Sequence, residues 1–153
     1  MIANQIGFYL EDYRAGDVIS HAPSKTVFES DNNLFSLLTM NHHPVHTNEV
    51  YAEAAQHGRI LVVGTLVFSL VVGMTVNDIS GKAIANLDYE KIEHLAPVFV
   101  GDTIRAESEI IDVSPSKSKP DRGVVYVETT GYNQSGQPVI RFRRHVLIPK
   151  KGE

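Results

Sequence analysis

One stretch of the chain decides the fold: Ile60-Leu61-Val62-Val63-Gly64-Thr65-Leu66-Val67-Phe68-Ser69-Leu70-Val71-Val72-Gly73-Met74-Thr75-Val76. It contains no charged residue, and Arg59 before it and Asn77-Asp78 after it close the run abruptly. A helix that spans a membrane needs about 20 predominantly apolar residues, and this run is shorter. The stretch therefore predicts a buried core helix whose N-terminus lies at Gly64.

The loop upstream of this helix is rich in imidazoles. The run Asn41-His42-His43-Pro44-Val45-His46 places three histidines and an amide around a proline that stops regular helix. Histidine is the side chain best suited to proton transfer near neutral pH. We expect this loop to supply the groups for proton chemistry. The N-terminus of the helix at Gly64 would present backbone N–H groups to a substrate oxygen.

Composition narrows the classes of function. With 153 residues, 42% hydrophobic and 21% charged, the sequence predicts a single globular domain over residues 1–153. The net charge of −4 gives no nucleic-acid signature, although Arg141, Arg143 and Arg144 make the last segment locally basic. The absence of cysteine excludes disulfides and thiolate metal sites. The N-terminus lacks the basic leader and apolar segment of a secretory signal, so we expect a cytoplasmic protein.

Two short helices are predicted before the central one. The first is expected to end near Met40 and the second to span residues 49–56. The candidate caps are Ser30 or Asp31 for the first helix and Thr47 or Asn48 for the second. The apolar faces are expected to comprise Leu34, Leu37 and Leu38 in the first helix, and Val50, Tyr51 and the alanines in the second.

Extended segments dominate the rest of the chain. They are expected at residues 17–29, with a break near Pro23, and, after a turn at 77–82, at residues 83–95, 103–113, 123–132 and 137–149. Alternation places one face of the 103–113 segment inward: Ile104, Ala106, Ser108 and Ile110. Residues 133–136 are typical of a hairpin turn. Helices followed by antiparallel strands predict an α+β domain with a helix packed on one face of a sheet.

Four pieces of the sequence, in this order, resemble one known family. They are residues 35–46, residues 58–64, the run Pro97-Val98-Phe99-Val100-Gly101-Asp102-Thr103, and the terminal hairpin. Together they resemble the MaoC-like, R-specific enoyl-CoA hydratase family, near its mesaconyl-CoA, methylmalyl-CoA and itaconyl-CoA hydratases. The resemblance covers residues 12–149. It implies a hotdog fold, which is a curved antiparallel sheet wrapped around one long central helix.

The resemblance also implies an activity. Members are lyases that add or remove water across the 2,3-double bond of an enoyl-CoA, here a branched or dicarboxylic C4–C5 acyl group. Coenzyme A would be part of the substrate, with no separate cofactor. Because a single hotdog leaves a sheet edge uncovered, we expect a homodimer or a higher assembly of dimers, with no nucleic-acid or membrane partner.

The family's active-site segment reads Asp-x-Asn-Pro-x-His. His46 matches its histidine, Asn41 stands in place of its catalytic aspartate, and His43 stands where it has asparagine. Gly64 matches the glycine whose N–H stabilises the thioester oxyanion, and Val63 replaces a histidine common just before it. The resemblance therefore implies His46, Asn41 and Gly64 as the catalytic residues.

The change at Asn41 matters because an amide cannot take up a proton, although it can accept from and donate to water. Hydration would then rest on His46 as the sole strong base, with Asn41 orienting the water, unless His42 or His43 takes part. The loss of one general base typically costs on the order of 10²–10⁴ in rate.

The expected substrate-binding residues are Arg59, Val63, Thr65 and His43. Arg59 would anchor a substrate carboxylate or a phosphate of coenzyme A, or would simply close a loop. The basic last segment leaves the same choice open, between phosphate binding and a solvated strand face. No metal is expected, because three histidines spaced around Pro44 converge poorly on one ion and Glu49 is the only nearby carboxylate.

Two other functions stay open. A hotdog thioesterase is disfavoured because such enzymes usually rely on a carboxylate near the helix, and this apolar helix offers none. A non-catalytic acyl-CoA-binding or regulatory subunit is favoured by Asn41.

Overall fold

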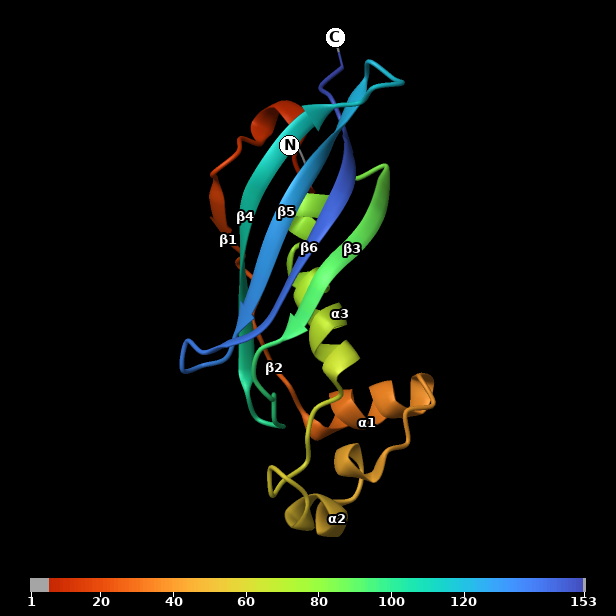
Figure 1. The fold of residues 1–153 in the computed structure, drawn as a ribbon, viewed down its shortest axis with the longest axis vertical. Coiled ribbons are helices and arrows are strands. Elements are labelled where there is room, and N and C mark those ends of the chain that lie inside the picture. The colour runs from red at the N-terminus through yellow and green to blue at the C-terminus, as the bar shows by residue number, and fades with distance from the viewer. Residues whose placement is uncertain (1–5, 153) are drawn as a thin grey trace, which may run out of the picture.

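The structure is a computed structural model that describes residues 6–152, and it consists of an antiparallel sheet wrapped around one helix (Figure 1). The sheet has six strands in the order β1-β4-β5-β6-β3, and β2 pairs with β4 off this path. The strands are β1 (Val18–Ser20), β2 (Lys25–Thr26), β3 (Ala85–His94), β4 (Thr103–Pro115), β5 (Arg122–Tyr132) and β6 (Pro138–Pro149). This architecture confirms the predicted α+β class and its strand order along the chain.

The alternation read from the sequence decides which face of the sheet is buried. In β4 all four residues of the predicted inward face are buried: Ile104, Ala106, Ser108 and Ile110. The same alternation buries Val125 and Val127 in β5, and the hairpin between β5 and β6 turns at Gly136, whose φ is 76°. Within the described chain no helix is long and apolar enough to cross a membrane.

The central helix, α3 (Gly64–Met74), begins at the residue that the sequence predicted. Val67, Val71 and Met74 form its fully buried face and pack in the core formed with β4 and β6. A π-helical turn, η3 (Val76–Ser80), follows where a simple turn was expected at residues 77–82, so that expectation is corrected.

Arg144 of β6 contacts the chain where α3 ends. Its side chain is only 1% exposed and donates to the Thr75 hydroxyl, at the junction of α3 and η3, and to Asn86 Oδ1 at 3.2 Å. Burial lowers the pKa of the Arg144 guanidinium. Arg144 is therefore a core residue and is unavailable for the phosphate patch considered for this segment.

The first helix, α1 (Glu29–Leu38), differs from the prediction at both its start and its inner face. Phe28 occupies the N-cap, and Asp31 accepts the Phe28 N–H at 2.8 Å from within the first turn, so neither Ser30 nor Asp31 is the cap. The three leucines of the expected packing face are exposed: Leu34 58%, Leu37 60% and Leu38 72%. Asn32 and Ser36 are the buried residues instead. The reason is that α1 lies in an arm beyond the end of the sheet (Figure 1), where its inner face meets backbone rather than apolar core.

The other elements of the arm are the 3-10 turn η2 (Pro44–His46) and the helix α2 (Glu49–Ala54). Asn48 caps α2 by accepting the Tyr51 N–H at 2.9 Å, as predicted. Of the expected packing residues, Ala52 is buried, whereas Val50 and Tyr51 are 79% and 46% exposed. A short 3-10 turn, η1 (Leu10–Asp12), closes the opposite end of the sheet.

Candidate active site

His46 is positioned by the short turn η2. Pro44 occupies the start of the turn, where its missing N–H costs no hydrogen bond. His43 caps it, because its Nδ1 accepts the Val45 N–H at 3.1 Å and its carbonyl accepts the His46 N–H at 3.0 Å. The turn points His46 back toward the residues that precede α3.

The hydrogen bond of the His46 ring fixes its tautomer. Nδ1 lies 2.7 Å from the Leu61 carbonyl oxygen. A carbonyl oxygen can only accept, so Nδ1 carries the proton and the neutral ring keeps a lone pair on Nε2. Nε2 has no hydrogen-bond partner within residues 6–152. A half-buried imidazole held in this way is equipped to act as a general base.

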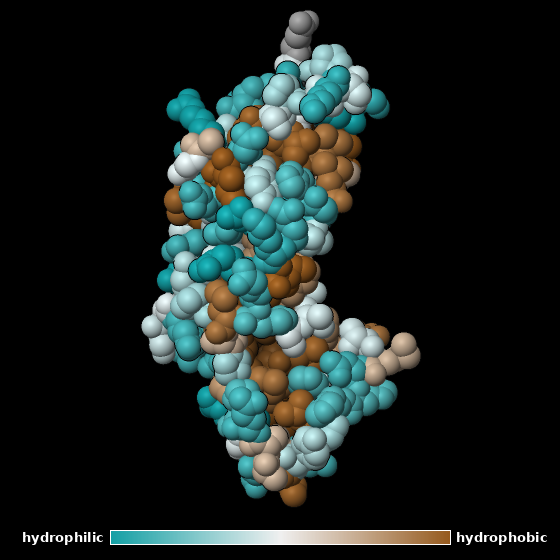
Figure 2. All heavy atoms as spheres, viewed as in Figure 1, coloured by the Kyte–Doolittle hydropathy of each residue, from teal (hydrophilic) through white to brown (hydrophobic). Residues whose placement is uncertain are grey.

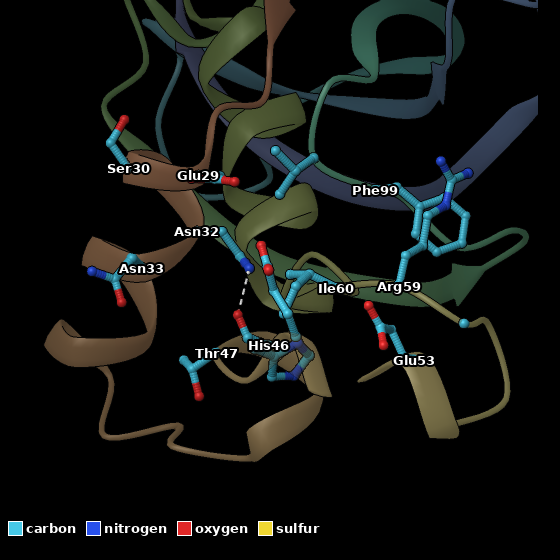
Figure 3. A pocket seen from close by; sticks show the side chains of 13 residues that line it. Glu29, Ser30, Asn32, Asn33, His46, Thr47, Glu53, Arg59, Ile60 and Phe99 are labelled. Carbon is cyan, nitrogen blue, oxygen red and sulfur yellow. Dashed lines mark hydrogen bonds between the residues drawn. The ribbon is translucent and has the colours of Figure 1, made fainter. Parts of the chain in front are cut away.

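His46 lines a cavity of about 610 Å³ in the arm, a size typical of small-molecule sites (Figure 3). The cavity is walled by α1, η2, α2 and the segments around residues 58–60 and 99–100. Its charged residues are Glu29, Glu49, Glu53 and Arg59. Arg59 is thus the one cation among the described residues of the wall.

The Arg59 guanidinium lies over the ring of Phe99, with 3.6 Å between its central carbon and the ring centroid. This contact holds the guanidinium in place without neutralising its charge. No ion pair to Arg59 occurs in the part of the chain that the structure describes. Arg59 is therefore available to bind an anion at this wall of the cavity.

Asn32, which sequence reasoning did not single out, lies at the centre of the site. It is 2% exposed, and its amide contacts backbone atoms of His46, Leu61 and Val63. Figure 3 shows the contact with His46. The available signal was the spacing of Asn32 and Ser36, which are four residues apart on one helix face. The apolar periodicity of the leucines instead predicted the opposite face of the helix as the buried one.

Gly64 begins α3, and its neighbour Val63 is the N-cap. The N–H groups of Gly64 and Thr65 have no acceptor within residues 6–152. These two N–H groups at the N-terminus of α3 can stabilise a negative charge. A Cβ added to Gly64 would lie 2.9 Å from Cε1 of His94, so only glycine fits here without a shift. His94 ends β3 and has no local sequence signal that links it to the helix.

A second cavity, of about 390 Å³, adjoins Gly64. It is lined by Gly64, His57, His94 and apolar residues from segments 61–67 and 95–98, with Val139. His46 and Gly64 therefore open onto different cavities, and the segment from Leu61 to Val63 runs between them. His46 is tied to that segment through Leu61.

The remaining expected site residues lie outside both cavities. Asn41 is half-buried, and its Oδ1 accepts the His43 N–H at 3.4 Å. His43 is exposed, and its ring centroid is 6.1 Å from that of His46. Val63 is 2% exposed, and Thr65 is exposed at the first turn of α3. The structure thus brings His46 and Arg59 together around one cavity but not the other residues.

One group of side chains in the described structure has the composition of a metal site. The ligand atoms of Asp88, Glu90 and His145, on β3 and β6, lie within 4.8 Å of one another. These groups already have partners: His145 Nδ1 lies 2.9 Å from Asp88, and Glu90 accepts from the Tyr126 hydroxyl. The bond from His145 lowers the pKa of the Asp88 carboxyl. The group belongs to the sheet and is separate from the His46 cavity.

An antiparallel sheet wrapped around a single helix defines a class of fold. The class is the hotdog fold, and solved hotdog proteins superpose on this chain. A structure from Chloroflexus aurantiacus, described as a MaoC domain protein dehydratase, matches with a TM-score of 0.91 and 35% identity. The match covers 95% of this chain and 41% of that one.

Within this class the chain belongs to the mesaconyl-CoA hydratase family, whose sequence model matches residues 3–153. A mesaconyl-CoA hydratase from Cereibacter sphaeroides is 39% identical over 145 residues, which are 95% of this chain and 42% of the relative. An (R)-specific enoyl-CoA hydratase from Rhodospirillum rubrum is 29% identical over 144 residues, 94% of each chain. The chain thus spans about two-fifths of the length of the Cereibacter mesaconyl-CoA hydratase.

Proposed function

We propose that this protein is an acyl-CoA hydratase or dehydratase, a lyase acting on the 2,3-double bond of an enoyl-CoA. One observation carries the proposal: the Leu61 carbonyl, 2.7 Å from His46 Nδ1, leaves Nε2 as a free base in a ring that lines the 610 Å³ cavity. Membership of the mesaconyl-CoA hydratase family supports the same chemistry.

In hydration, His46 Nε2 takes a proton from water while the water oxygen bonds to C3 of the enoyl thioester. The electrons of the double bond shift toward the thioester carbonyl, and the N–H groups of Gly64 and Thr65 stabilise the enolate oxygen. Protonated His46 then returns the proton to C2, and dehydration reverses these steps. No cofactor is needed, because coenzyme A is part of the substrate.

The base and the oxyanion donors open onto different cavities. The acyl group must therefore extend from one cavity to the other alongside the segment from Leu61 to Val63. His43 and Thr65 lie outside both cavities, so their contact with the substrate stays a prediction from the sequence. Val63 would contribute through the shape of the helix start, since its side chain is buried. Asn41 lies outside both cavities, so its role in orienting the water stays a prediction from the sequence.

We extend the proposal to a branched or dicarboxylic C4–C5 acyl group, with Arg59 as the anion-binding residue. The support is a guanidinium fixed on Phe99 and free of ion pairs among the described residues. Arg59→Gln tests the substrate class, because it removes the positive charge that would hold the acyl carboxylate. KM should rise for mesaconyl-CoA and not for crotonyl-CoA, and an equal rise with both would contradict a carboxylate site at Arg59.

A homodimer is also part of the proposal. β3 is an edge strand of ten residues, and its side chains Leu87, Tyr89 and Ile92 are 52%, 40% and 45% exposed. Figure 2 shows apolar surface on the side where β3 runs in Figure 1. A long apolar edge favours pairing with another strand. Because His94 ends β3 and lines the second cavity, a partner paired there would border that cavity too.

Light scattering at micromolar concentration tests this assembly. A homodimer should give twice the chain mass of 16.9 kDa, and a stable monomer would contradict the paired-edge arrangement. A cytoplasmic location completes the proposal, and cell fractionation tests it.

The decisive assay follows the enoyl absorbance of crotonyl-CoA and mesaconyl-CoA with the purified protein. Loss of absorbance without release of free coenzyme A supports the hydratase. Release of free coenzyme A would identify the thioesterase. Binding of acyl-CoA without conversion would identify a non-catalytic subunit.

A further inference from the structure

Asn32 is a buried amide whose hydrogen bonds end on three backbone atoms of the site. Its Oδ1 accepts the Val63 N–H at 2.9 Å, and its Nδ2 donates to the carbonyl oxygens of His46 at 3.1 Å and Leu61 at 3.4 Å. These contacts join segments that are 14, 29 and 31 residues away in sequence. One side chain therefore links the loop of the base to the start of α3.

An amide is the side chain that this position requires. Two carbonyl oxygens need donors and one N–H needs an acceptor, and only asparagine or glutamine supplies both from one planar group. A carboxylate would face two carbonyl oxygens with no proton to share. An apolar residue would leave all three backbone groups without this partner in a buried position.

The contacts act on the base from two sides. Asn32 holds the carbonyl of His46, and the Leu61 carbonyl accepts from both Asn32 Nδ2 and His46 Nδ1. The amide thus holds the backbone of His46 directly and its ring through the Leu61 carbonyl. That arrangement sets both the direction of Nε2 and the tautomer of the ring.

The same amide acts on the oxyanion donors. Val63 is the N-cap of α3, and its N–H is held by Asn32 Oδ1 one residue before Gly64. The direction in which the first free N–H groups of the helix point depends on this contact. Asn32 therefore relates the base and the oxyanion donors, although they open onto different cavities.

We propose that Asn32 is a positioning residue that sets the relative placement of His46 Nε2 and the N–H groups of Gly64 and Thr65. This inference rests on the proposed function. A purely structural role would be to hold α1 against the rest of the chain. The two roles are separable because Ser36 is buried on the same face of α1 and its hydroxyl has no hydrogen-bond partner in the described chain.

The test compares Asn32→Ala and Asn32→Asp with two matched controls. Ser36→Ala changes the same helix face without removing a hydrogen bond. Asn33→Asp adds a charge to an exposed residue of the same cavity wall without touching the three backbone atoms. Folding of every variant is checked by thermal unfolding.

We expect Asn32→Ala to lower kcat by about 100-fold with KM changed by less than threefold, because a misplacement near 1 Å costs about that much. Asn32→Asp should lower kcat similarly and shift the acid limb of the kcat/KM profile to higher pH, because its negative charge favours the protonated form of His46. Ser36→Ala should stay within twofold of wild type. Asn33→Asp adds a negative charge to the wall of the proposed substrate cavity, so it should raise KM, while the His46 tautomer stays as in wild type.

A second readout does not depend on activity. Nitrogen-15 spectra of the histidine rings should show His46 as the Nδ1–H tautomer in wild type and Ser36→Ala, and as a mixture in Asn32→Ala. If wild type hydrates no enoyl-CoA, the proposed function fails and the spectra alone decide the role of Asn32. If Asn32→Ala does not fold, the isosteric Asn32→Asp decides by the same readouts. A folded variant with an unchanged His46 tautomer and kcat near wild type would overturn the proposal, as would an equal loss in Ser36→Ala.

Discussion

Two histidines of this molecule make contrasting use of their ring nitrogens. His21 uses both: Nδ1 lies 2.7 Å from Asp78 Oδ2, and Nε2 lies 2.7 Å from the Ser108 hydroxyl, which in turn lies 2.7 Å from the hydroxyl of Thr129. His46 uses only Nδ1, on a backbone carbonyl. By residue types, the Asp-His-Ser chain at His21 looks more catalytic than His46 does.

Burial reverses that impression. The side chain of His21 is fully buried, Ser108 is 1% exposed, and neither lines one of the two cavities. A nucleophile that no substrate can reach performs no chemistry, so this chain of hydrogen bonds stabilises the packing of β4, β5 and η3. A free nitrogen beside a cavity, rather than an arrangement of residue types, identifies the site.

The largest expected effect separates the two histidines by activity. His46→Ala should lower the hydration rate by about 10²–10⁴, the usual contribution of a general base. His42→Ala is the matched control, since it removes an exposed imidazole of the same loop and should stay near wild type. Steady-state assays on crotonyl-CoA measure both. A His46→Ala enzyme that kept a tenth of the wild-type rate would remove His46 as the base.

The next largest expected effect distinguishes His21 from His46 by their contributions to stability. His21→Ala should lower the free energy of unfolding by about 2–4 kcal/mol, because it leaves Ser108 and Asp78 without their buried partner. Urea unfolding measures this, with His46→Ala as the comparison, which should cost about 1 kcal/mol for its single bond to a backbone carbonyl. Equal losses in the two variants would contradict the division of roles.

The prediction of the fold from sequence succeeded where periodicity reports burial directly. The charge-free run of residues 60–76 predicted a buried helix, and that helix begins at Gly64 as expected. Alternation identifies the inward residues of β4 because a sheet has only two faces. The leucine stripe of α1 led to a wrong prediction of the buried face. Periodicity identifies an apolar face of a helix but not the surface that packs against it. In this case the helix turned a polar face inward.

The site was predictable only in part, for a related reason. His46 and Gly64 are local features of motifs, whereas Asn32 and His94 matter through contacts with distant segments. Nothing near Asn32 in the sequence indicates that its amide will meet the backbone 31 residues later. Such contacts become visible only when the chain is folded.

A smaller effect is expected at the wall of the His46 cavity. Arg59→Gln should raise KM for mesaconyl-CoA by about tenfold, the factor that corresponds to a lost contact of about 1.4 kcal/mol, and leave kcat nearly unchanged. Arg59→Lys is the control: it keeps the charge but loses the planar stacking on Phe99, and should recover part of the affinity. The same rise with crotonyl-CoA would assign Arg59 to coenzyme A rather than to the acyl carboxylate. No rise with either substrate would remove Arg59 from the site.

The smallest expected effect lies in the region of His21, and it depends on pH only in the alkaline range. Tyr13 donates its hydroxyl proton to the carbonyl oxygens of Asp78, at 2.5 Å, and Ile79, at 3.2 Å. Burial, followed by the charges of Asp78 and Asp12, raises the pKa of Tyr13 above its ordinary value of 10.0. A raised pKa in the folded state stabilises the fold below pH 10 and loses that contribution as the pH rises further.

Tyr13→Phe should therefore be less stable than wild type at neutral pH, and the difference should shrink as the pH rises past the ordinary pKa of 10.0. Denaturant unfolding at several pH values measures the difference. A gap between the two proteins that stays constant across this range would show that the hydroxyl contributes no pH-dependent stability.

Chemical rescue of His46→Ala by imidazole tests the central claim most directly. Removing the ring leaves space in a cavity of about 610 Å³, and free imidazole can supply the missing base there. Hydration of crotonyl-CoA by the variant should rise with imidazole concentration and follow the unprotonated fraction of imidazole as the pH changes. His42→Ala and wild type should not respond. A variant that binds crotonyl-CoA yet gains no activity at any imidazole concentration would contradict a role for His46 as the base.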